Sequence, residues 1–130
     1  MTLRPLILVV DDTVDTRRLM RRVLERAGVR VAEAGTGEAA LAAIRGTRPD
    51  AVVLDLRLPG MSGFDVARAV RSDPDAGIAS TPILACSASV QAEVMREALD
   101  AGCNAFEGKP FEIRTFADVA LGLIAQRAPG

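Results

Sequence analysis

The chain has 130 residues, with 16 Lys or Arg against 17 Asp or Glu, so its formal net charge is −1. One domain with its own hydrophobic core is expected at this length, and no apolar run approaches the roughly 18 residues that a membrane-spanning helix needs. The lack of basic excess, Trp and Tyr argues against a nucleic-acid partner, and the lack of His excludes His-based triads and His-ligated metals.

Five short aliphatic runs predict β-strands, and segments with helical spacing separate them. Two of the runs, Leu6–Val10 and Ala51–Leu54, are apolar at every position, which is typical of strands covered on both faces. Strands that alternate with helices indicate parallel crossovers. The sequence therefore predicts an α/β, doubly wound (βα)5 domain over residues 1–130. Its strands are expected at Leu6–Val10, Val29–Ala34, Ala51–Leu56, Pro82–Ser87 and Asn104–Glu107.

Apolar residues at steps of three and four predict a helix after each strand. Gly28 is expected to cap the first helix, and Gly46 with Pro49 to end the second. The polar segment 72–77 is expected to be a loop. The side chains expected to face the core are Leu19, Met20, Val23, Leu24, Ala27, Ala40, Leu41, Ile44, Val66, Ala67, Val70, Val90, Val94, Met95, Ala98, Leu99, Ile113, Phe116, Val119, Ala120, Leu123 and Ile124.

Charged or hydroxyl side chains follow four of the predicted strands. Asp11 and Asp12 follow the first strand, Asp55 the third, Ser87 the fourth and Lys109 the fifth. Ligands of open α/β sheets bind at this carboxyl edge. Each residue alone has an ordinary structural explanation, such as helix capping by an Asp, but such residues at four strand ends along one edge favour a functional site.

The charges of these residues indicate a divalent cation. Three close carboxylates carry −3 and Lys109, the only Lys of the chain, restores +1. The remaining −2 matches one divalent ion. An all-oxygen site beside a phosphoryl group is typical of Mg²⁺, with Mn²⁺ as the alternative.

The start of the chain and its two cysteines bear on location. The apolar run Leu6–Val10 ends at once in two acidic residues, which a secretory signal would not tolerate. We therefore expect a cytoplasmic protein. Cys86 and Cys103 are too few for a disulfide framework and are expected to be buried free thiols.

Four ordered segments resemble the receiver domain of two-component response regulators, the CheY-like superfamily. They are LVVDD at 8–12, VLDLRLPGMSG at 53–63, PILACSA at 82–88 and AGCNAFEGKPF at 101–111, and the resemblance spans residues 5–125. It implies the strand order 2-1-3-4-5 with helices on both faces, and a function in phosphorelay signal transduction.

The resemblance also implies roles for individual residues. Asp55 would accept a phosphoryl group from a phosphohistidine of a partner histidine kinase or histidine phosphotransfer protein, since this chain has no His. Asp12, Asp55 and the backbone carbonyl of Arg57 would ligate Mg²⁺ directly, and Asp11 mainly through water. The domain would catalyse only its own phosphorylation and dephosphorylation, and would otherwise not be an enzyme.

Further implied roles concern switching. Ser87 would move toward the phosphoryl group, Lys109 would pair with it, and Phe106, where many relatives have Tyr, would be the rotamer switch. Pro110 would follow a cis peptide bond. The fourth helix, fifth strand and fifth helix, residues 90–125, would then dock a downstream protein target.

Two surface features allow both a functional and a structural interpretation. Arg57 at the pocket mouth, together with Ser89, is predicted to tune the lifetime of the phosphoryl group, or Arg57 is simply a solvated side chain. Arg18 and Arg22 align on one face of the first helix and are predicted to dock an acidic face of the kinase, or they form an ordinary solvated face.

Several alternatives stay open. Only residues 127–130 follow the last predicted helix, so we expect a stand-alone receiver or the excised receiver of a larger regulator or hybrid histidine kinase. A receiver-like interaction module that is never phosphorylated is another alternative. A haloacid-dehalogenase-type phosphatase would need Asp-x-Asp, and a dinucleotide binder would need a third glycine where Ala40 stands.

Overall fold

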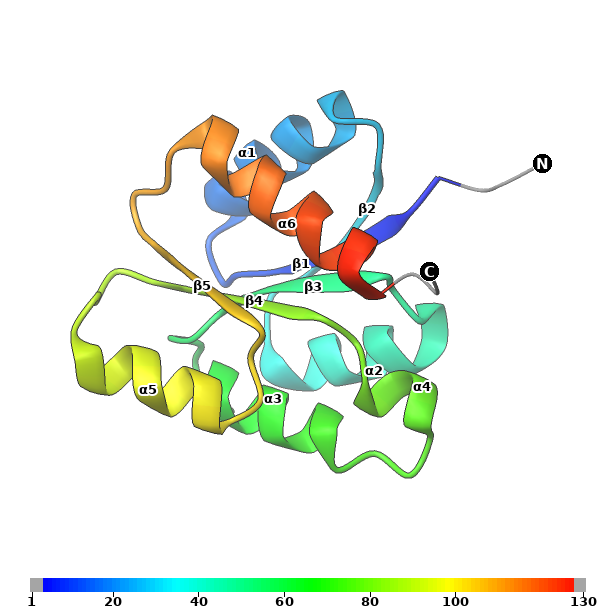
Figure 1. Cartoon of the computed structure of the whole chain (residues 1–130), viewed down its shortest axis with the longest axis vertical. Coiled ribbons are helices and arrows are strands. Elements are labelled where there is room, and N and C mark those ends of the chain that lie inside the picture. The colour runs from blue at the N-terminus through cyan, green and yellow to red at the C-terminus, as the bar shows by residue number, and fades with distance from the viewer. Residues whose placement is uncertain (1–3, 128–130) are drawn as a thin grey trace.

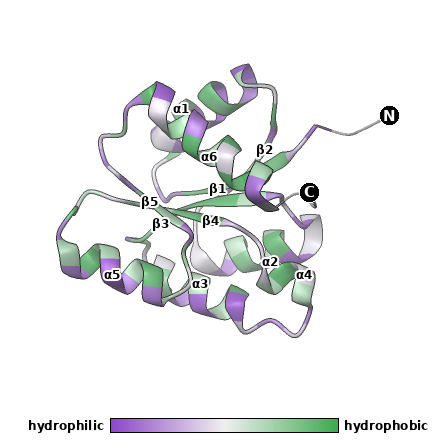
Figure 2. Ribbon diagram, in the orientation of Figure 1, coloured by the Kyte–Doolittle hydropathy of each residue, from purple (hydrophilic) through white to green (hydrophobic). Residues whose placement is uncertain are grey.

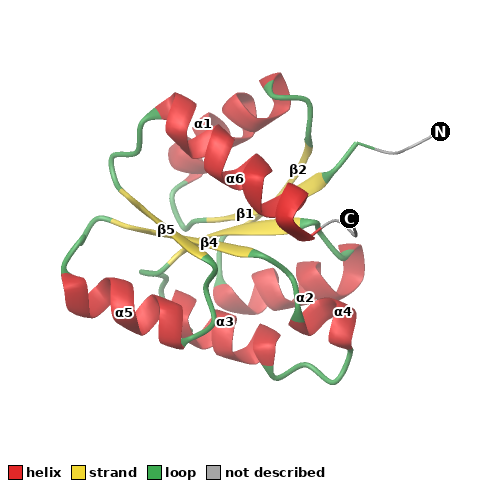
Figure 3. Cartoon of the chain, in the orientation of Figure 1, coloured by secondary structure: helices red, strands yellow, loops and turns green. Residues whose placement is uncertain are grey.

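The computed structural model describes residues 4–127 and contains one five-stranded parallel sheet (Figures 1 and 3). The strand order is β2-β1-β3-β4-β5, which confirms the predicted fold class and topology. Each strand lies within its predicted range or extends one residue beyond it. The strands are β1 (Leu6–Val10), β2 (Arg30–Ala34), β3 (Ala51–Asp55), β4 (Ile83–Ser87) and β5 (Ala105–Gly108).

Helices cover both faces of the sheet and divide the core in two (Figure 1). In β1, Leu8 and Val10 face one helical layer and Ile7 and Val9 face the other. Alternate side chains of a strand point to opposite faces, so a strand buried on both sides is mostly apolar. Strand β1 is apolar throughout and β3 is apolar up to its last residue, Asp55, and the hydrophobic colour of the central strands is visible in Figure 2. One layer contains α1 (Val14–Arg26) and α6 (Ile113–Arg127), and the other contains α2 (Gly37–Thr47), α3 (Gly63–Arg71), α4 (Ala76–Ala79) and α5 (Ala92–Asp100).

Local sequence sets where several helices begin and end. The Thr36 side chain accepts a hydrogen bond from a backbone N–H of the first turn of α2, and Ser62 forms a capping box with Asp65 at the start of α3. Both satisfy backbone donors that a helix start leaves unpaired. Gly28 follows α1 with φ +95°, a left-handed conformation that favours glycine.

Two local predictions were wrong. The segment 72–77, expected to be a loop, contains the start of the short helix α4, because the Asp75 side chain accepts hydrogen bonds from two backbone N–H groups of its first turn. Gly46 lies inside α2 and does not end it. The helix ends at Thr47, and Arg48 has the left-handed φ of +48°.

Most of the predicted core residues are buried or partly buried, but six of them are exposed. Val90, Met95 and Leu99 are 63%, 39% and 56% exposed. The α5 helix buries only Ala98 fully and packs Val94 against the core, because it covers the sheet near its β5 edge, where there is less surface to bury. The other exposed exceptions are Leu19, Ala27 and Ile113, which line a groove between α1 and α6.

Candidate functional site

The parallel sheet brings four strand ends together at its carboxyl edge. Val10 pairs with Leu54 in register, so Asp11 and Asp12 lie beside Asp55, the last residue of β3. On the other side of β3, β4 ends at Ser87 and β5 leads into Lys109. The edge therefore gathers all five of the residues that sequence spacing singled out.

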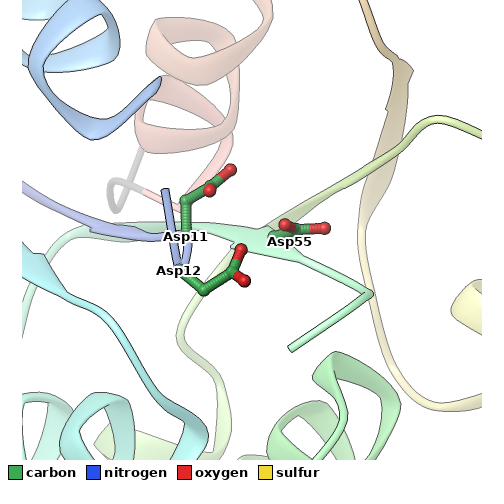
Figure 4. A group of neighbouring side chains, drawn as sticks. All are labelled: Asp11, Asp12 and Asp55. Carbon is green, nitrogen blue, oxygen red and sulfur yellow. The ribbon is translucent and has the colours of Figure 1, made fainter. Parts of the chain in front are cut away.

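The three carboxylates form one cluster (Figure 4). Each of Asp11, Asp12 and Asp55 offers an oxygen, and these oxygens all lie within 4.8 Å of one another. Asp11 is fully buried and Asp55 is 6% exposed, whereas Asp12 is exposed. The cluster thus has a buried base and one side open to solvent.

Lys109 forms ion pairs with two of the three carboxylates. Its Nζ lies 2.7 Å from Oδ2 of Asp11 and 3.2 Å from Oδ2 of Asp55. Burial lowers the pKa of the Lys109 ammonium, but its hydrogen bond to Asp11 and the charges of both carboxylates more than compensate and raise that pKa above its usual value. Lys109 therefore stays protonated and offsets one of the three negative charges.

Burial has the opposite consequence for Asp55. Desolvation raises the pKa of its carboxyl, although the backbone N–H of Arg57, 3.0 Å from Oδ1, and the Lys109 ammonium both favour the ionised form. A buried acid that keeps a raised pKa lacks enough positive charge around it. Burial therefore outweighs the two groups that favour the ionised form of Asp55.

A pocket of about 170 Å³ opens above these groups. The groups here that could bind a metal are carboxylate oxygens, the ligands that hard divalent cations prefer. Three carboxylates and one ammonium carry a net charge of −2, which one divalent cation would neutralise. The residues present therefore fit a metal site. The pocket is lined by Asp12, Asp55, Arg57, Ser87, Ala88, Ser89 and Lys109.

Of the residues expected to switch, Ser87 and Lys109 line this pocket and Phe106 does not. The Ser87 hydroxyl accepts a hydrogen bond from the backbone N–H of Ser89 at 3.1 Å, and the Ser87 carbonyl accepts one from the Lys109 N–H at 2.8 Å. Phe106 is half-buried and packs against the core beneath α5. The peptide bond between Lys109 and Pro110 is cis.

Cys86 and Cys103 are buried free thiols, as expected. Desolvation raises the pKa of Cys86 to about 12 and that of Cys103 to about 11. Only the thiolate is a good nucleophile, so neither cysteine contributes reactive chemistry at this edge.

Arg18 and Arg22 are exposed on α1 and do not enter the pocket. Sequence reasoning gave no role to their neighbour Arg17, whose Nη1 donates a 2.7 Å hydrogen bond to the Asp11 backbone carbonyl. One signal could have identified it. Arg17 lies three residues before Met20, which was expected in the core, so helical spacing places Arg17 on the inward side of α1.

The site thus consists of three carboxylates and one lysine at the carboxyl edge of a doubly wound α/β sheet. The family model of the response regulator receiver domain matches residues 7–120 of the chain. The chain belongs to this family. Receiver domains are signalling modules rather than conventional enzymes, and histidine kinases phosphorylate them.

Curated relatives match the receiver region. The chain is 39% identical over 111 residues to the DNA-binding response regulator MtrA of Mycobacterium tuberculosis, which covers 85% of this chain and 46% of MtrA. It is 36% identical over 118 residues to the sensory/regulatory protein RpfC of Xanthomonas campestris, which covers 88% of this chain and 16% of RpfC. The chain thus spans less than half the length of these relatives.

Solved structures match the whole fold. A response regulator from Chloroflexus aurantiacus aligns with a TM-score of 0.88 at 31% identity, covering 94% of this chain and 98% of that one. The chemotaxis protein CheY4 of Vibrio cholerae aligns with a TM-score of 0.86 at 29% identity, covering 92% and 98%. The acidic cluster described above is typical of a receiver metal site. Within residues 4–127, no helix has the length and apolar character to cross a membrane.

Proposed function

We propose that residues 1–130 act as a single receiver domain of a phosphorelay, in which Asp55 accepts a phosphoryl group from a phosphohistidine of a partner kinase or phosphotransfer protein. An Asp55 carboxylate oxygen would attack phosphorus, the phosphorus–nitrogen bond would break, and the imidazole would leave. The contact of Asp55 with Lys109, within a cluster that also contains Asp11 and Asp12, supports this function more than any other observation.

A divalent ion belongs to the proposal. Asp12, Asp55 and the Arg57 carbonyl would hold Mg²⁺, or Mn²⁺ in its place, with Asp11 acting through water. When bound, the ion supplies positive charge that the phosphoryl oxygens need. Lys109 already stands where it can pair with a second phosphoryl oxygen, since its Nζ contacts Asp55 directly.

The domain would also end its own signal. A water molecule that attacks the phosphorus of phospho-Asp55 releases inorganic phosphate and restores the carboxylate. Arg57 and Ser89 line the pocket that this water must enter, which supports a role for both in setting the phosphoryl lifetime.

Phosphorylation would shift the equilibrium between two arrangements of the β4–α5 loop. It changes the Asp55 side chain from a charge of −1 to about −2 and adds acceptor oxygens. The Ser87 hydroxyl, held by the Ser89 N–H in this structure, would exchange that partner for a phosphoryl oxygen. Phe106 would then repack toward the space beside Ser87.

The output surface would be the face formed by α5, β5 and α6, residues 90–125. Val90, Met95 and Leu99 are unusually exposed there for large apolar side chains. Met95 and Leu99 lie on α5 and Val90 lies in the loop before it. Exposed apolar side chains that are grouped in this way are typical of a protein-binding surface, so we propose that a downstream protein target docks on α5 and the β4–α5 loop.

The input surface would be α1 and its groove with α6. Arg18 and Arg22 form no ion pair with any residue in the described range 4–127. Unpaired cations beside apolar side chains fit an acidic, partly apolar helical face of the phosphohistidine-bearing partner. The groove has a volume of about 590 Å³ and is lined by Leu19, Arg22, Val23, Arg26, Ala27, Ile113, Arg114, Ala117 and Asp118.

Intact-protein mass spectrometry after incubation with a small phosphodonor and Mg²⁺ tests the proposal. We expect the gain of one phosphoryl group, which Asp55→Asn and removal of the metal both abolish. Asp100→Asn, an exposed carboxylate at the end of α5, is the matched control and should be labelled like the wild type. Absence of labelling from both a small donor and a phosphorylated partner would instead favour a receiver-like interaction module.

A further inference from the structure

The Arg17 side chain joins the acidic pocket to β2, the strand next to β1. Its Nη1 donates to the Asp11 backbone carbonyl at 2.7 Å, and its Nε donates to Oε1 of Glu33 in β2 at 3.0 Å. The side chain is only 17% exposed. One guanidinium therefore holds two separate chain segments through two nitrogens, which its planar fork allows.

Glu33 is itself fixed. Its second oxygen, Oε2, accepts a 2.6 Å hydrogen bond from Nε of Arg21, one turn further along α1. The hydrogen bond from Arg21, followed by that from Arg17, holds the pKa of the Glu33 carboxyl below its usual range despite partial burial. Glu33 therefore stays ionised and gives Arg17 a rigid anchor on β2.

Gly35 leaves the space that this arrangement needs. A Cβ atom at position 35 would lie 3.1 Å from Nη1 of Arg17 and 4.0 Å from the Asp11 carbonyl oxygen. That is closer than side-chain carbons ordinarily approach a neighbour. The absence of a side chain at Gly35 thus lets the guanidinium lie flat against the β1–α1 turn.

The Asp11 carbonyl belongs to the peptide unit that links Asp11 to Asp12. The rest of Asp11 is held by other groups: its N–H donates to the Ala34 carbonyl, and its carboxylate binds the Thr13 N–H and Lys109. Asp12 is exposed, and no hydrogen bond or ion pair of its side chain is formed within residues 4–127. Arg17 is thus the contact that sets the direction in which the chain presents Asp12.

We infer that Arg17 is a positioning residue for the metal site: by holding the Asp11–Asp12 peptide unit against Glu33, it orients Asp12 for the divalent ion. The inference rests on the proposed function, because it assumes that the cluster of Asp11, Asp12 and Asp55 binds a metal. Groups that orient metal ligands typically change metal affinity when they are removed.

The direction in which metal affinity changes when Arg17 is replaced distinguishes a positioning role from a purely electrostatic one. A guanidinium near a cation site repels the cation, so removal of Arg17 by charge alone would strengthen metal binding. Loss of positioning would weaken it. Arg17→Lys keeps the charge, but one ammonium cannot reach both the Asp11 carbonyl and Glu33 in the same way as the fork.

Mn²⁺ titration followed by electron paramagnetic resonance, with Mg²⁺ competition, measures the affinity directly and needs no phosphorylation. We expect Arg17→Met and Arg17→Lys each to raise the Mn²⁺ dissociation constant by about tenfold, the lower end of the range for groups that orient ligands. Phosphodonor labelling should slow at low Mg²⁺ and recover at saturating Mg²⁺. Arg21→Met, which loosens Glu33 but leaves both contacts of Arg17 in place, should weaken Mn²⁺ binding clearly less than Arg17→Met does.

Three outcomes would overturn the inference. They are wild-type affinity in Arg17→Lys, unchanged or tighter binding in Arg17→Met, and equal weakening in Arg17→Met and Arg21→Met, which would show a general loss of α1–β2 contacts. Urea unfolding identifies any variant that fails to fold. If Arg17→Met does not fold, the Mn²⁺ affinity of Arg17→Lys tests the inference. A wild-type protein that binds no Mn²⁺ would overturn the proposed metal site, and this inference with it.

Discussion

Lys109 and Asp11 are 98 positions apart in the chain, yet the Nζ of Lys109 lies 2.7 Å from Oδ2 of Asp11. This ion pair joins the end of β5 to the end of β1 across the carboxyl edge of the sheet. It is well shielded, because Asp11 is fully buried and the Lys109 side chain is 22% exposed. The contact both stabilises the fold and offsets part of the charge of the acidic pocket.

Replacement of Lys109 by Met should therefore destabilise the metal-free protein. Asp11 would remain buried with only the Thr13 N–H as a partner, and removal of one member of a buried pair costs about 3 kcal/mol. Urea unfolding in EDTA measures this loss, which should shrink in Mg²⁺ because the ion offsets the same charge. The exposed Arg57→Gln should change stability by less than about 0.5 kcal/mol. If Lys109→Met loses the same stability with and without Mg²⁺, then the ion and Lys109 do not offset the same negative charge.

The raised pKa of Asp55 predicts a pH-dependent stability in EDTA. Because the pKa is higher in the folded state than the ordinary value of 3.8, the folded protein binds the proton more tightly. Stability is therefore lost as the pH rises through that window. Asp55→Asn removes this cost and should be more stable than the wild type at neutral pH, by on the order of 1 kcal/mol. This difference in the free energy of unfolding should shrink as the pH falls, because Asp55 then becomes protonated in both the folded and the unfolded protein. Urea unfolding over a range of pH measures it. A difference that stays constant or grows as the pH falls would refute desolvation of the Asp55 carboxylate as the cause.

Arg57→Met should lengthen the lifetime of phospho-Asp55. Arg57 is exposed and lines the pocket, and an apolar side chain in its place attracts the attacking water less. A barrier increase of about 1 kcal/mol corresponds to roughly fivefold slower hydrolysis. The decay of the phosphorylated species, followed by mass spectrometry after removal of the phosphodonor, measures this rate. Equal decay in the two proteins would show that Arg57 does not tune the lifetime.

Charge reversal on α1 should impair transfer from the partner alone. With Arg18→Glu and Arg22→Glu together, we expect phosphoryl transfer from the kinase to slow by about tenfold at low salt, because exposed charges act mainly on the association rate. Labelling by a small phosphodonor should not change. Arg96→Glu on α5, a single reversal in the opposite helical layer, serves as the control. If transfer and small-donor labelling slow equally, the variants affect the pocket and not docking.

Two glycines in helices should respond to alanine in opposite directions. At Gly63, the first residue of α3, a Cβ would lie 2.6 Å from the Leu56 Cα and even closer to the Asp55 carbonyl oxygen, so Gly63→Ala should destabilise the protein by about 1–3 kcal/mol. At Gly46 in α2 no atom lies within 4 Å of that position, and Gly46→Ala should stabilise by about 0.5–1 kcal/mol. Thermal or urea unfolding compares the two, and a neutral Gly63→Ala would show that α3 can move away from β3.

The sequence by itself determined the fold class and the main site candidates. Strand β1 and the first four residues of β3 are apolar at every position because both faces are covered, and this pattern is visible without a structure. The sequence also predicted that the site residues lie together, since the carboxyl ends of parallel strands share one edge of the sheet. These residues are Asp11, Asp12, Asp55, Ser87 and Lys109.

Tertiary structure decided which helix faces are buried and which neighbours the site residues have. Apolar spacing predicted that Met95 and Leu99 face inward, but the narrow edge of the sheet under α5 leaves them exposed. Likewise, helical spacing places Arg17 on the inward side of α1, but only the packing of α1 beside the end of β1 and against β2 gives Arg17 its two partners. Local patterns encode burial and strand ends, whereas the contacts of a long, flexible side chain depend on where distant segments pack.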